Sequence, residues 1–188
     1  MRGRVLKEGM PIRPATPADI PAITAIYDEA VRNGTASFEL EPPGPEEMAR
    51  RQAALMEGGY PYLVLEENGK VLGYAYASPF RPRVAYRYTV ENSIYVDEAA
   101  RGQKVGRRLL EALIAECEAL GFRQMVAVIG DSGNAGSIAL HRACGFGSIG
   151  TLPATGLKFG RWIDTVLMQR ALGEGANTIP ADADLLKG

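Results

Sequence analysis

The sequence predicts a single domain of mixed α/β (α+β) architecture. Its 188 residues are enough for one ordinary domain and too few for two. Segments with strand-like and helix-like hydrophobic spacing follow in the order β, α, α, a β-meander, then β-α-β-α-β-β, which indicates both parallel and antiparallel pairing. The composition, 46% hydrophobic and 23% charged, is that of an ordinary globular chain.

The charge balance and the cysteine count argue against several classes of protein. Lys plus Arg number 21 against 22 Asp plus Glu, so a main role in coating nucleic acid or anionic membrane is not expected. No apolar stretch approaches the roughly 18–20 residues of a membrane span, and the N-terminus has no apolar signal region. The two cysteines form neither a disulfide framework nor a metal-ligand spacing. We expect a soluble cytoplasmic protein with no metal, no nucleic acid and no membrane partner.

The domain is expected to span residues 10–172, between a loose N-terminal extension (1–9) and a flexible C-terminal tail (173–188). Met10 is an alternative start. Thr16, Pro17 and Asp19 open the first helix, because threonine can cap it, proline suits its first position and Asp19 completes a capping box. Gly34 ends that helix, and a second helix is predicted for residues 45–57.

The strongest local signal is a β-hairpin. Strand-like residues 62–67 and 71–77 flank Asn68-Gly69, a pair suited to a type I′ turn. A segment rich in proline and arginine, 79–87, interrupts the sheet before a strand at 89–96. The remaining predicted elements are a helix at 104–120, a buried strand at 124–129, a short helix at 137–143, and strands at 147–151 and 163–170.

The turn after strand 89–96 carries the first chemical signal. The N-terminus of the helix that follows offers unpaired N–H groups and the positive end of the helix dipole, which together attract phosphate. Gly102 and Gly106 leave room for a pyrophosphate to approach the backbone. Basic side chains at this place oppose the dipole, so a bound anion explains them better than a solvated turn does. The spacing fits neither a Walker A loop nor a Gly-x-Gly-x-x-Gly turn. The basic residues are Arg101, Lys104, Arg107 and Arg108.

A second motif follows about thirty residues later, Asn134-x5-Leu140-His141-x3-Gly145-Phe146. Together with the turn, it resembles the GNAT superfamily of N-acetyltransferases. That superfamily holds the pyrophosphate of acetyl-CoA with the pattern Arg/Gln-x-x-Gly-x-Gly/Ala, which Arg101 and Gly106 match, with Lys104 in place of the first glycine. The resemblance implies a GNAT-like acyl-CoA N-acyltransferase fold, with a mostly antiparallel sheet flanked by helices and acetyl-CoA as co-substrate.

Further segments resemble the branch that acetylates phosphinothricin and methionine sulfoximine. This implies transfer of an acetyl group to the α-amino group of a small amino acid analogue, such as phosphinothricin, methionine sulfoximine or methionine sulfone. Two alternatives stay open: acetylation of a peptide or protein N-terminus or of a polyamine, and a non-catalytic acyl-CoA-binding protein. The matching segments are Thr35-Ala36-Ser37-Phe38-Glu39, Arg81-Pro82-Arg83-x-Ala85-Tyr86, Thr89-Val90-Glu91-x-Ser93-x-Tyr95-Val96 and Gly156-x-Lys158-x-Gly160-x-Trp162-x-Asp164.

Two residues are predicted to carry the chemistry. Glu91 shares one strand face with Ser93 and Tyr95. Burying a charged carboxylate there costs free energy unless the group has a partner or a function, and burial would raise its pKa. Glu91 is therefore the expected general base. The alternative for Glu91 is a solvent-facing strand residue. His141, the only histidine, stands where many superfamily members carry a tyrosine that protonates the leaving thiolate. Imidazole can titrate near neutral pH, so His141 could serve as that acid or as a second base. Its alternative is a structural histidine.

The remaining site residues follow mainly from the resemblance. The strand end at residues 94–96 is expected to pair its backbone with pantetheine, and Asn134 can bind the same arm or cap its helix. Guanidinium groups at Arg81 and Arg83 suit an anionic acceptor. A homodimer is implied, with residues 151–162 reaching across its axis. The predicted coenzyme set is Ile94, Tyr95, Val96, Arg101, Gly102, Gln103, Lys104, Val105, Gly106, Arg107, Asn134 and Ser137, and the predicted acceptor set is Phe38, Arg81, Arg83, Tyr86, Glu91, Asn92, Ser93 and Trp162.

Overall fold

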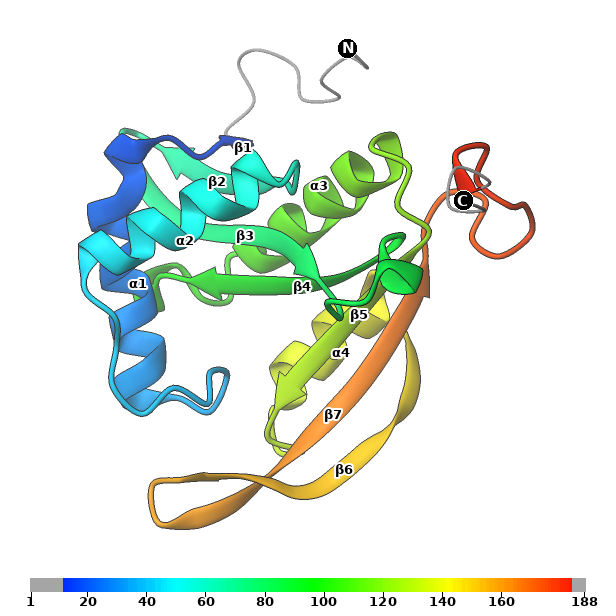
Figure 1. Cartoon of the computed structure of the whole chain (residues 1–188). Helices are drawn as coiled ribbons and strands as arrows, with labels where there is room; N and C mark the ends of the chain where they lie inside the picture. The colour runs from blue at the N-terminus through cyan, green and yellow to red at the C-terminus, as the bar shows by residue number, and fades with distance from the viewer. Residues whose placement is uncertain (1–11, 184–188) are drawn as a thin grey trace.

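A computed structural model describes residues 12–183 as one seven-stranded sheet with helices on both faces (Figure 1). The strand order is β1-β2-β3-β4-β5-β7-β6, and β4–β5 is the one parallel pair among the described strands. The predicted mixed, mostly antiparallel sheet is therefore confirmed. Within this part of the chain, no helix is both long enough and apolar enough to cross a bilayer. The predicted N-terminal extension, residues 1–9, lies outside the described residues.

The first elements are β1 (Ile12–Pro14), a 3-10 turn (Pro17–Asp19), α1 (Ile20–Asn33) and α2 (Pro45–Glu57). The Asp19 carboxylate accepts hydrogen bonds from the Thr16 amide at 2.7 Å and from the Thr16 hydroxyl at 2.9 Å. Asp19 thus organises the start of the helix as the sequence predicts. The helix also ends at the predicted glycine, Gly34.

The central strands follow the sequence prediction closely. They are β2 (Tyr62–Glu67), β3 (Lys70–Pro79) and β4 (Thr89–Val96). Asn68 and Gly69 have φ values of 52° and 75°, so both occupy the left-handed region that a type I′ turn requires. Next come α3 (Val105–Ala119), β5 (Gln124–Gly130) and α4 (Ala135–Ala143), each within two residues of its predicted bounds.

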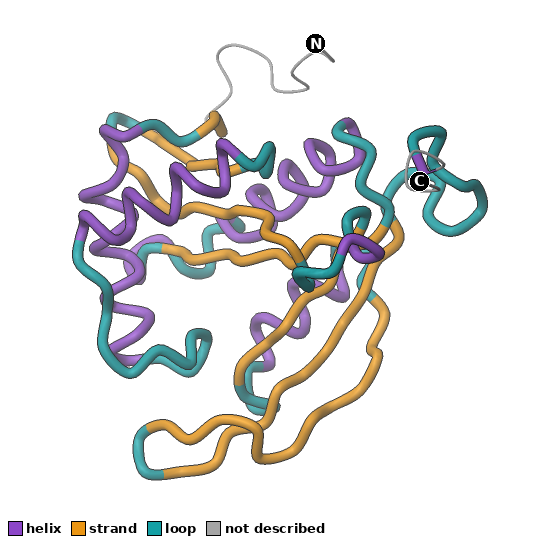
Figure 2. The backbone as a smooth tube through the Cα atoms, in the orientation of Figure 1, coloured by secondary structure: helices purple, strands orange, loops and turns teal. Residues whose placement is uncertain are grey.

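The last two strands, β6 (Gly147–Lys158) and β7 (Arg161–Ala171), are longer than predicted. The predicted end of this strand was residue 151, and β6 continues past Pro153 and Gly156, residue types that usually interrupt strands. Here β6 is the edge strand, and its pairing shifts register between Leu152 and Gly156, so both residues are accommodated. The result is a long hairpin that extends away from the body of the molecule (Figures 1 and 2).

Two hydrophobic cores lie on opposite faces of the sheet. One contains α1 and α2 with Tyr62, Val64 and Tyr74, and the other contains α3 with Leu63, Leu65 and many β4 and β5 neighbours. Side chains alternate along β4, so one strand faces both cores. Those facing α1 and α2 are Glu91, Ser93 and Tyr95, and those facing α3 and α4 are Asn92, Ile94 and Val96.

Part of the predicted C-terminal tail is tied to the domain. The Tyr88 hydroxyl donates to the Asp182 carboxylate at 2.6 Å. The Arg123 guanidinium donates to the Gly175 carbonyl at 3.3 Å and to the Thr178 hydroxyl at 3.0 Å. The described residues 173–183 therefore contact the domain, whereas residues 184–188 lie outside the description.

Candidate active site

β4 and β5 are paired over only part of their length. The parallel register runs from Thr89 opposite Gln124 to Asn92 opposite Ala127, although β4 continues to Val96 and β5 continues to Gly130. The strands then diverge, as Figure 1 shows, and the described ladder gives this edge of β4 no strand partner. A cavity of about 850 Å³ opens at the divergence.

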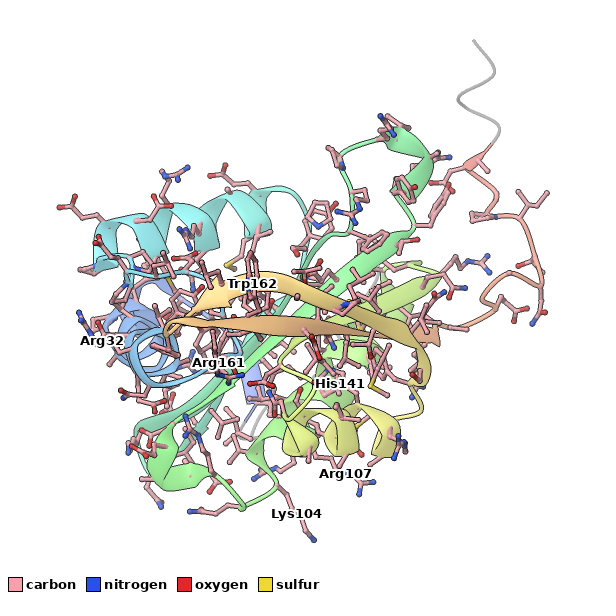
Figure 3. All side chains as sticks on the ribbon, turned by 90° about the horizontal axis from the view of Figure 1, so that it is seen from below. Arg32, Lys104, Arg107, His141, Arg161 and Trp162 are labelled. Atoms are coloured by element: carbon pink, nitrogen blue, oxygen red, sulfur yellow. The ribbon has the colours of Figure 1, made fainter. Side chains whose placement is uncertain are left out.

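The cavity is lined by the ends of β4 and β5, the turn before α3 and the starts of α3 and α4. Residues 34–36, which follow α1, form another wall. All predicted coenzyme residues line this cavity except Gln103, whose amide donates to the Ala99 carbonyl at 2.9 Å and holds the turn instead. In Figure 3, Lys104 and Arg107 project from the side of the molecule on which α3 begins, and His141 lies further inside.

The turn before α3 depends on two left-handed residues. Gly102 has a φ of 79° and Lys104, which caps α3, has a φ of 63°. The left-handed conformation costs a residue with a side chain about 1–2 kcal/mol, and glycine avoids that cost. The backbone at Lys104 therefore has the conformation that the glycine of the usual pattern favours.

Arg101 and Gly106 also have structural partners. The Arg101 guanidinium donates to the Glu29 carboxylate of α1 at 2.5 Å, which links the turn to the opposite side of the cavity. A Cβ at Gly106 would lie 3.3 Å from Leu140 and 3.5 Å from Val96. The glycine therefore lets α3 pack closely against α4 and β4 beside the cavity.

At the start of α4, the Asn134 side chain accepts a hydrogen bond from the Ser137 amide at 3.1 Å, as expected of a helix cap. His141 is buried one turn later. Its Nδ1 lies 2.8 Å from the Ser137 carbonyl, which can only accept, so Nδ1 carries the proton. Its Nε2 lies 3.1 Å from the Asn92 side-chain nitrogen and accepts from it.

These hydrogen bonds make His141 a neutral ring with both nitrogens engaged. Burial lowers the pKa of His141, the Ser137 carbonyl partly offsets this effect, and the neutral form is favoured near pH 7. The ring thus has no uncommitted proton for a departing thiolate. Proton transfer by His141, as acid or as second base, would require one of these hydrogen bonds to break, and its catalytic role stays a prediction.

Glu91 lies on the opposite face of β4 from His141. Its neighbour across the antiparallel pair is Ser78, and its neighbour on β5 is Val126. Burial raises the pKa of the Glu91 carboxyl, and the positive charge of Arg81 opposes that rise. Glu91 does not line the 850 Å³ cavity, but the next two residues, Asn92 and Ser93, do.

The other predicted acceptor residues are less closely gathered. Arg81, Arg83 and Tyr86 occupy an exposed loop around a 3-10 turn, Val84–Tyr86, in which Phe80 packs against Tyr86 with ring centroids 5.7 Å apart. Trp162 is 64% exposed on the hairpin. Within a single chain, Trp162 does not line the cavity, because alternation on the edge hairpin directs it to solvent.

The family follows from a comparison with known proteins. The model of the Acetyltransferase (GNAT) family matches residues 23–146, which is more than half of the chain. The chain belongs to the GNAT family of acetyltransferases. It is therefore an acetyl-CoA-dependent N-acetyltransferase, and its seven-stranded sheet is the GNAT fold.

Named relatives place this GNAT chain within the phosphinothricin and methionine sulfoximine branch. It is 58% identical over 162 residues to phosphinothricin N-acetyltransferase of Alcaligenes faecalis, covering 86% of this chain and 82% of that protein. It is 48% identical over 162 residues to an L-methionine sulfoximine/L-methionine sulfone acetyltransferase of Pseudomonas paraeruginosa, covering 84% and 92%. A phosphinothricin acetyltransferase from Sinorhizobium meliloti, crystallised with acetyl-CoA, superimposes with a TM-score of 0.88 at 53% identity, covering 92% and 93%.

The cavity of this GNAT chain fits acetyl-CoA chemically. Arg101, Lys104 and Arg107 surround the N-terminus of α3, where an anionic pyrophosphate is favoured. The unpaired edge of β4 offers backbone donors and acceptors suited to the two amides of a pantetheine arm. Among residues 12–183, no group of three or more His, Cys, Asp or Glu side chains is placed to hold a metal.

Five tyrosines form a cluster near Glu91, of which only Tyr95 was predicted from the sequence as a site residue. They cover the α1/α2 face of the sheet, with neighbouring ring centroids 4.9–6.3 Å apart. Burial raises the pKa of these phenols, so they are neutral near pH 7. Tyr76 of β3 lies directly opposite Ser93 of β4, two residues from Glu91. The available signal was the pair Tyr74 and Tyr76, which lie two residues apart on one predicted strand and so share a face. The set is Tyr27, Tyr62, Tyr74, Tyr76 and Tyr95.

Proposed function

We propose that this enzyme transfers the acetyl group of acetyl-CoA to the α-amino group of a small amino acid analogue of the phosphinothricin, methionine sulfoximine or methionine sulfone type. The names of its relatives support this substrate class. The observation that carries the proposal is the partly buried Glu91 carboxyl, placed just before β4 parts from β5 and near the charge of Arg81.

Glu91 is the proposed general base. An α-amino group is mostly an ammonium at neutral pH and must lose a proton before its nitrogen can attack a carbonyl carbon. A carboxylate with a raised pKa accepts that proton, directly or through water, more readily than an ordinary glutamate does. The N–C bond forms as the C–S bond breaks. Of the two protons lost by the ammonium, one ends on the released sulfur and the other leaves through Glu91.

The proposed coenzyme site comprises the cavity residues. Acetyl-CoA supplies an activated thioester carbonyl when bound. The turn at residues 101–107 would hold its phosphates, and the backbone at residues 94–96 and the start of α4, at Asn134 and Ser137, would hold its pantetheine arm. A backbone N–H of β4 facing the thioester oxygen would stabilise its developing charge.

We assign His141 a different role from the predicted one. Since both ring nitrogens are engaged, His141 is proposed to position Asn92, the last residue of β4 that pairs with β5. The histidine would thereby fix the place where the strands part. It acts through Asn92 and is a positioning residue in this proposal.

The acceptor is proposed to bind on the Glu91 face of the sheet. Arg81 and Arg83 would pair with its anionic groups, because a guanidinium matches oxyanions with two parallel hydrogen bonds. Ser93, Phe38 and Tyr86 would complete the pocket, whereas Asn92, which was predicted with them, faces His141 on the other side of the sheet.

A homodimer is proposed from the shape of the hairpin. The hairpin presents a run of exposed apolar side chains, a feature typical of a protein–protein contact. In such a dimer, Trp162 would reach its predicted place in an acceptor pocket across the two-fold axis. We also propose a cytoplasmic location, which the two buried free cysteines support. The exposed apolar residues are Ile149, Leu152, Leu157, Phe159 and Trp162.

A thiol-release assay tests the proposed function. Acetyl-CoA is offered with phosphinothricin, methionine sulfoximine or methionine sulfone, and in parallel with a peptide panel and with spermidine. We expect the highest kcat/KM with one of the three amino acid analogues. Preference for peptides or spermidine would replace the substrate class. Tight coenzyme binding without thiol release from any amine would make the chain a coenzyme-binding protein.

A further inference from the structure

Lys158 is a buried cation in the hairpin. It lies near the end of β6 and is only 3% exposed. Its ammonium donates to two backbone carbonyls far away in sequence, Gly34 at 3.0 Å and Ser37 at 2.8 Å. Within residues 12–183, Lys158 forms no ion pair. Burying an ammonium without a carboxylate partner is costly, and here two carbonyls offset that cost.

The segment that Lys158 holds is a wall of the active site. Residues 34–36 line the cavity at the divergence of β4 and β5. The Ser37 hydroxyl lies 2.9 Å from the Tyr27 hydroxyl, and the Tyr27 ring packs edge-on against Tyr95 of β4. Because Tyr95 shares its strand face with Glu91, the segment lies on the side of the sheet where the acceptor is proposed to bind.

Two glycines leave space for the same segment. A Cβ at Gly156 of β6 would lie 2.6 Å from the Phe38 ring, and a Cβ at Gly130 of β5 would lie 2.0 Å from the Thr35 carbonyl oxygen. Both distances are too short for a real side chain, so residues 34–38 can occupy this place only because positions 130 and 156 are glycine. Residues 34–38 therefore pack closely against both the β6–β7 hairpin and β5.

The Asp131 carboxylate links the same segment to the hairpin a second time. The Thr35 hydroxyl donates to the Asp131 carboxylate at 3.3 Å, and Arg161 of the hairpin donates to the same carboxylate at 2.5 Å. Figure 1 shows the tip of the hairpin below the α1–α2 connection, and Figure 3 shows Arg161 on the side of the molecule where α1 ends near Arg32. Lys158 and Arg161 thus hold the same segment from one hairpin.

We propose that Lys158 is a positioning residue for the acceptor, because its ammonium fixes the wall formed by residues 34–38. The identity of the acceptor rests on the proposed function, whereas the fixing of the wall does not. Lys158 acts through the Gly34 and Ser37 carbonyls, and its nitrogen has no part in proton transfer. Loss of the ammonium should therefore weaken acceptor binding more than coenzyme binding, since β4, α3 and α4 form most of the coenzyme cavity.

The test compares Lys158→Met with Lys158→Arg and with the control Lys70→Met. Lys70 is a 60% exposed lysine that pairs with Asp97, outside the coenzyme cavity. We expect Lys158→Met to raise the acceptor KM at least tenfold, to change the coenzyme Kd less than threefold, and to speed amide hydrogen exchange in residues 34–38. Arginine can donate to both carbonyls and should restore part of the acceptor affinity. Lys70→Met should change none of these quantities.

The outcomes separate this proposal from a merely structural role and from the proposed function. If Lys158 only stabilised the fold, the folded fraction would fall while the acceptor KM of the folded enzyme and the local exchange stayed unchanged, and the proposal would be overturned. If the wild-type chain acetylates none of the three analogues, the substrate class fails, but hydrogen exchange still tests the fixing of the wall. If Lys158→Met does not fold, Gly156→Ala replaces it. That variant displaces the Phe38 ring and should raise the acceptor KM, and an unchanged KM would contradict the proposal.

Discussion

Neighbouring side chains on β4 serve opposite sides of the sheet. Glu91 faces the tyrosines beneath α1 and α2, and Asn92 faces His141 on α4. Strand alternation therefore places the proposed proton acceptor, Glu91, on one side of the sheet and the hydrogen-bonded pair of Asn92 and His141 on the other. The chemistry therefore depends on the pairing register of β4, because a shift by one residue would exchange the two sides.

Glu91→Gln should lower kcat by about 10²- to 10⁴-fold, the usual contribution of a general base. The coenzyme Kd, measured by calorimetry with CoA, should stay unchanged because Glu91 lies outside the coenzyme cavity. The wild-type kcat should rise with pH through the raised pKa of Glu91, and the variant should lose this rise. Glu57→Gln, at an exposed position at the end of α2, is the control. Wild-type turnover by Glu91→Gln would reject the assignment of the base.

The same substitution should change stability with a defined sign. Burial raises the pKa of Glu91, so the folded chain holds this proton more tightly than the unfolded chain does. The free energy of unfolding therefore falls as pH rises from the ordinary glutamate pKa through the raised folded value. Glu91→Gln removes this loss. Its Tm should exceed that of the wild type at pH 8, and the difference should vanish near pH 4. A lower Tm at pH 8 would contradict this account.

Lys104 offers a matched comparison at one residue. Lys104→Gly and Lys104→Ala both remove the charge, but only glycine relieves the left-handed backbone. Urea unfolding should give the glycine variant a free energy of unfolding about 1 kcal/mol above that of the alanine variant. Equal loss of coenzyme affinity in both would attribute that loss to the ammonium. Equal stability of the two variants would show that the backbone at residue 104 is not strained.

At the scale of elements, the ion pair between Arg101 and Glu29 joins α1 to the turn before α3. If Arg101 binds the pyrophosphate as proposed, Glu29 would compete with it for the guanidinium. Partly exposed ion pairs contribute about 0.2–1 kcal/mol, so Glu29→Gln should tighten the coenzyme Kd by about 1.4- to 5-fold. Asp28→Asn on the same helix, which frees Arg32 instead, is the control for calorimetry. Weaker coenzyme binding by Glu29→Gln would mean that the pair positions Arg101 rather than competing for it.

Elements with local signals were predictable, and elements that depend on their neighbours were not. The turn at Asn68-Gly69 and the helix start at Thr16 are each determined by residues adjacent in sequence, so both were predicted. The extension of β6 past Pro153 depends on its edge position, which no local pattern reveals.

The candidate site divides in the same way. The turn before α3 is contiguous in sequence, and its residues were correctly predicted to lie together at one site, apart from Gln103, which bonds to Ala99 instead. The hydrogen bond to the second His141 nitrogen comes from Asn92, 49 positions away. The carbonyls that accept from Lys158 belong to residues more than 120 positions away. Such partners are set by the packing of the folded chain, so a motif alone could not identify them.

At the scale of the whole molecule, the hairpin gives a test of assembly. Leu157→Glu places a charge on its exposed apolar face, where Leu157 is 58% exposed. If the hairpin forms the proposed dimer, sedimentation at micromolar concentration should show half the wild-type mass for this variant. Leu120→Glu, at an exposed leucine after α3, should leave the mass unchanged. A wild-type chain that sediments as a monomer would contradict the dimer.

The parting of β4 from β5 also has a consequence for the lifetime of the enzyme in a cell. A ligand that bridges the two strand ends binds the folded chain and not the unfolded one, and at 100 times its Kd it adds about 2.7 kcal/mol to the free energy of unfolding. We therefore expect resistance to proteolysis to rise with the supply of acetyl-CoA, so that a starved cell would clear this catalyst faster than a well-fed one.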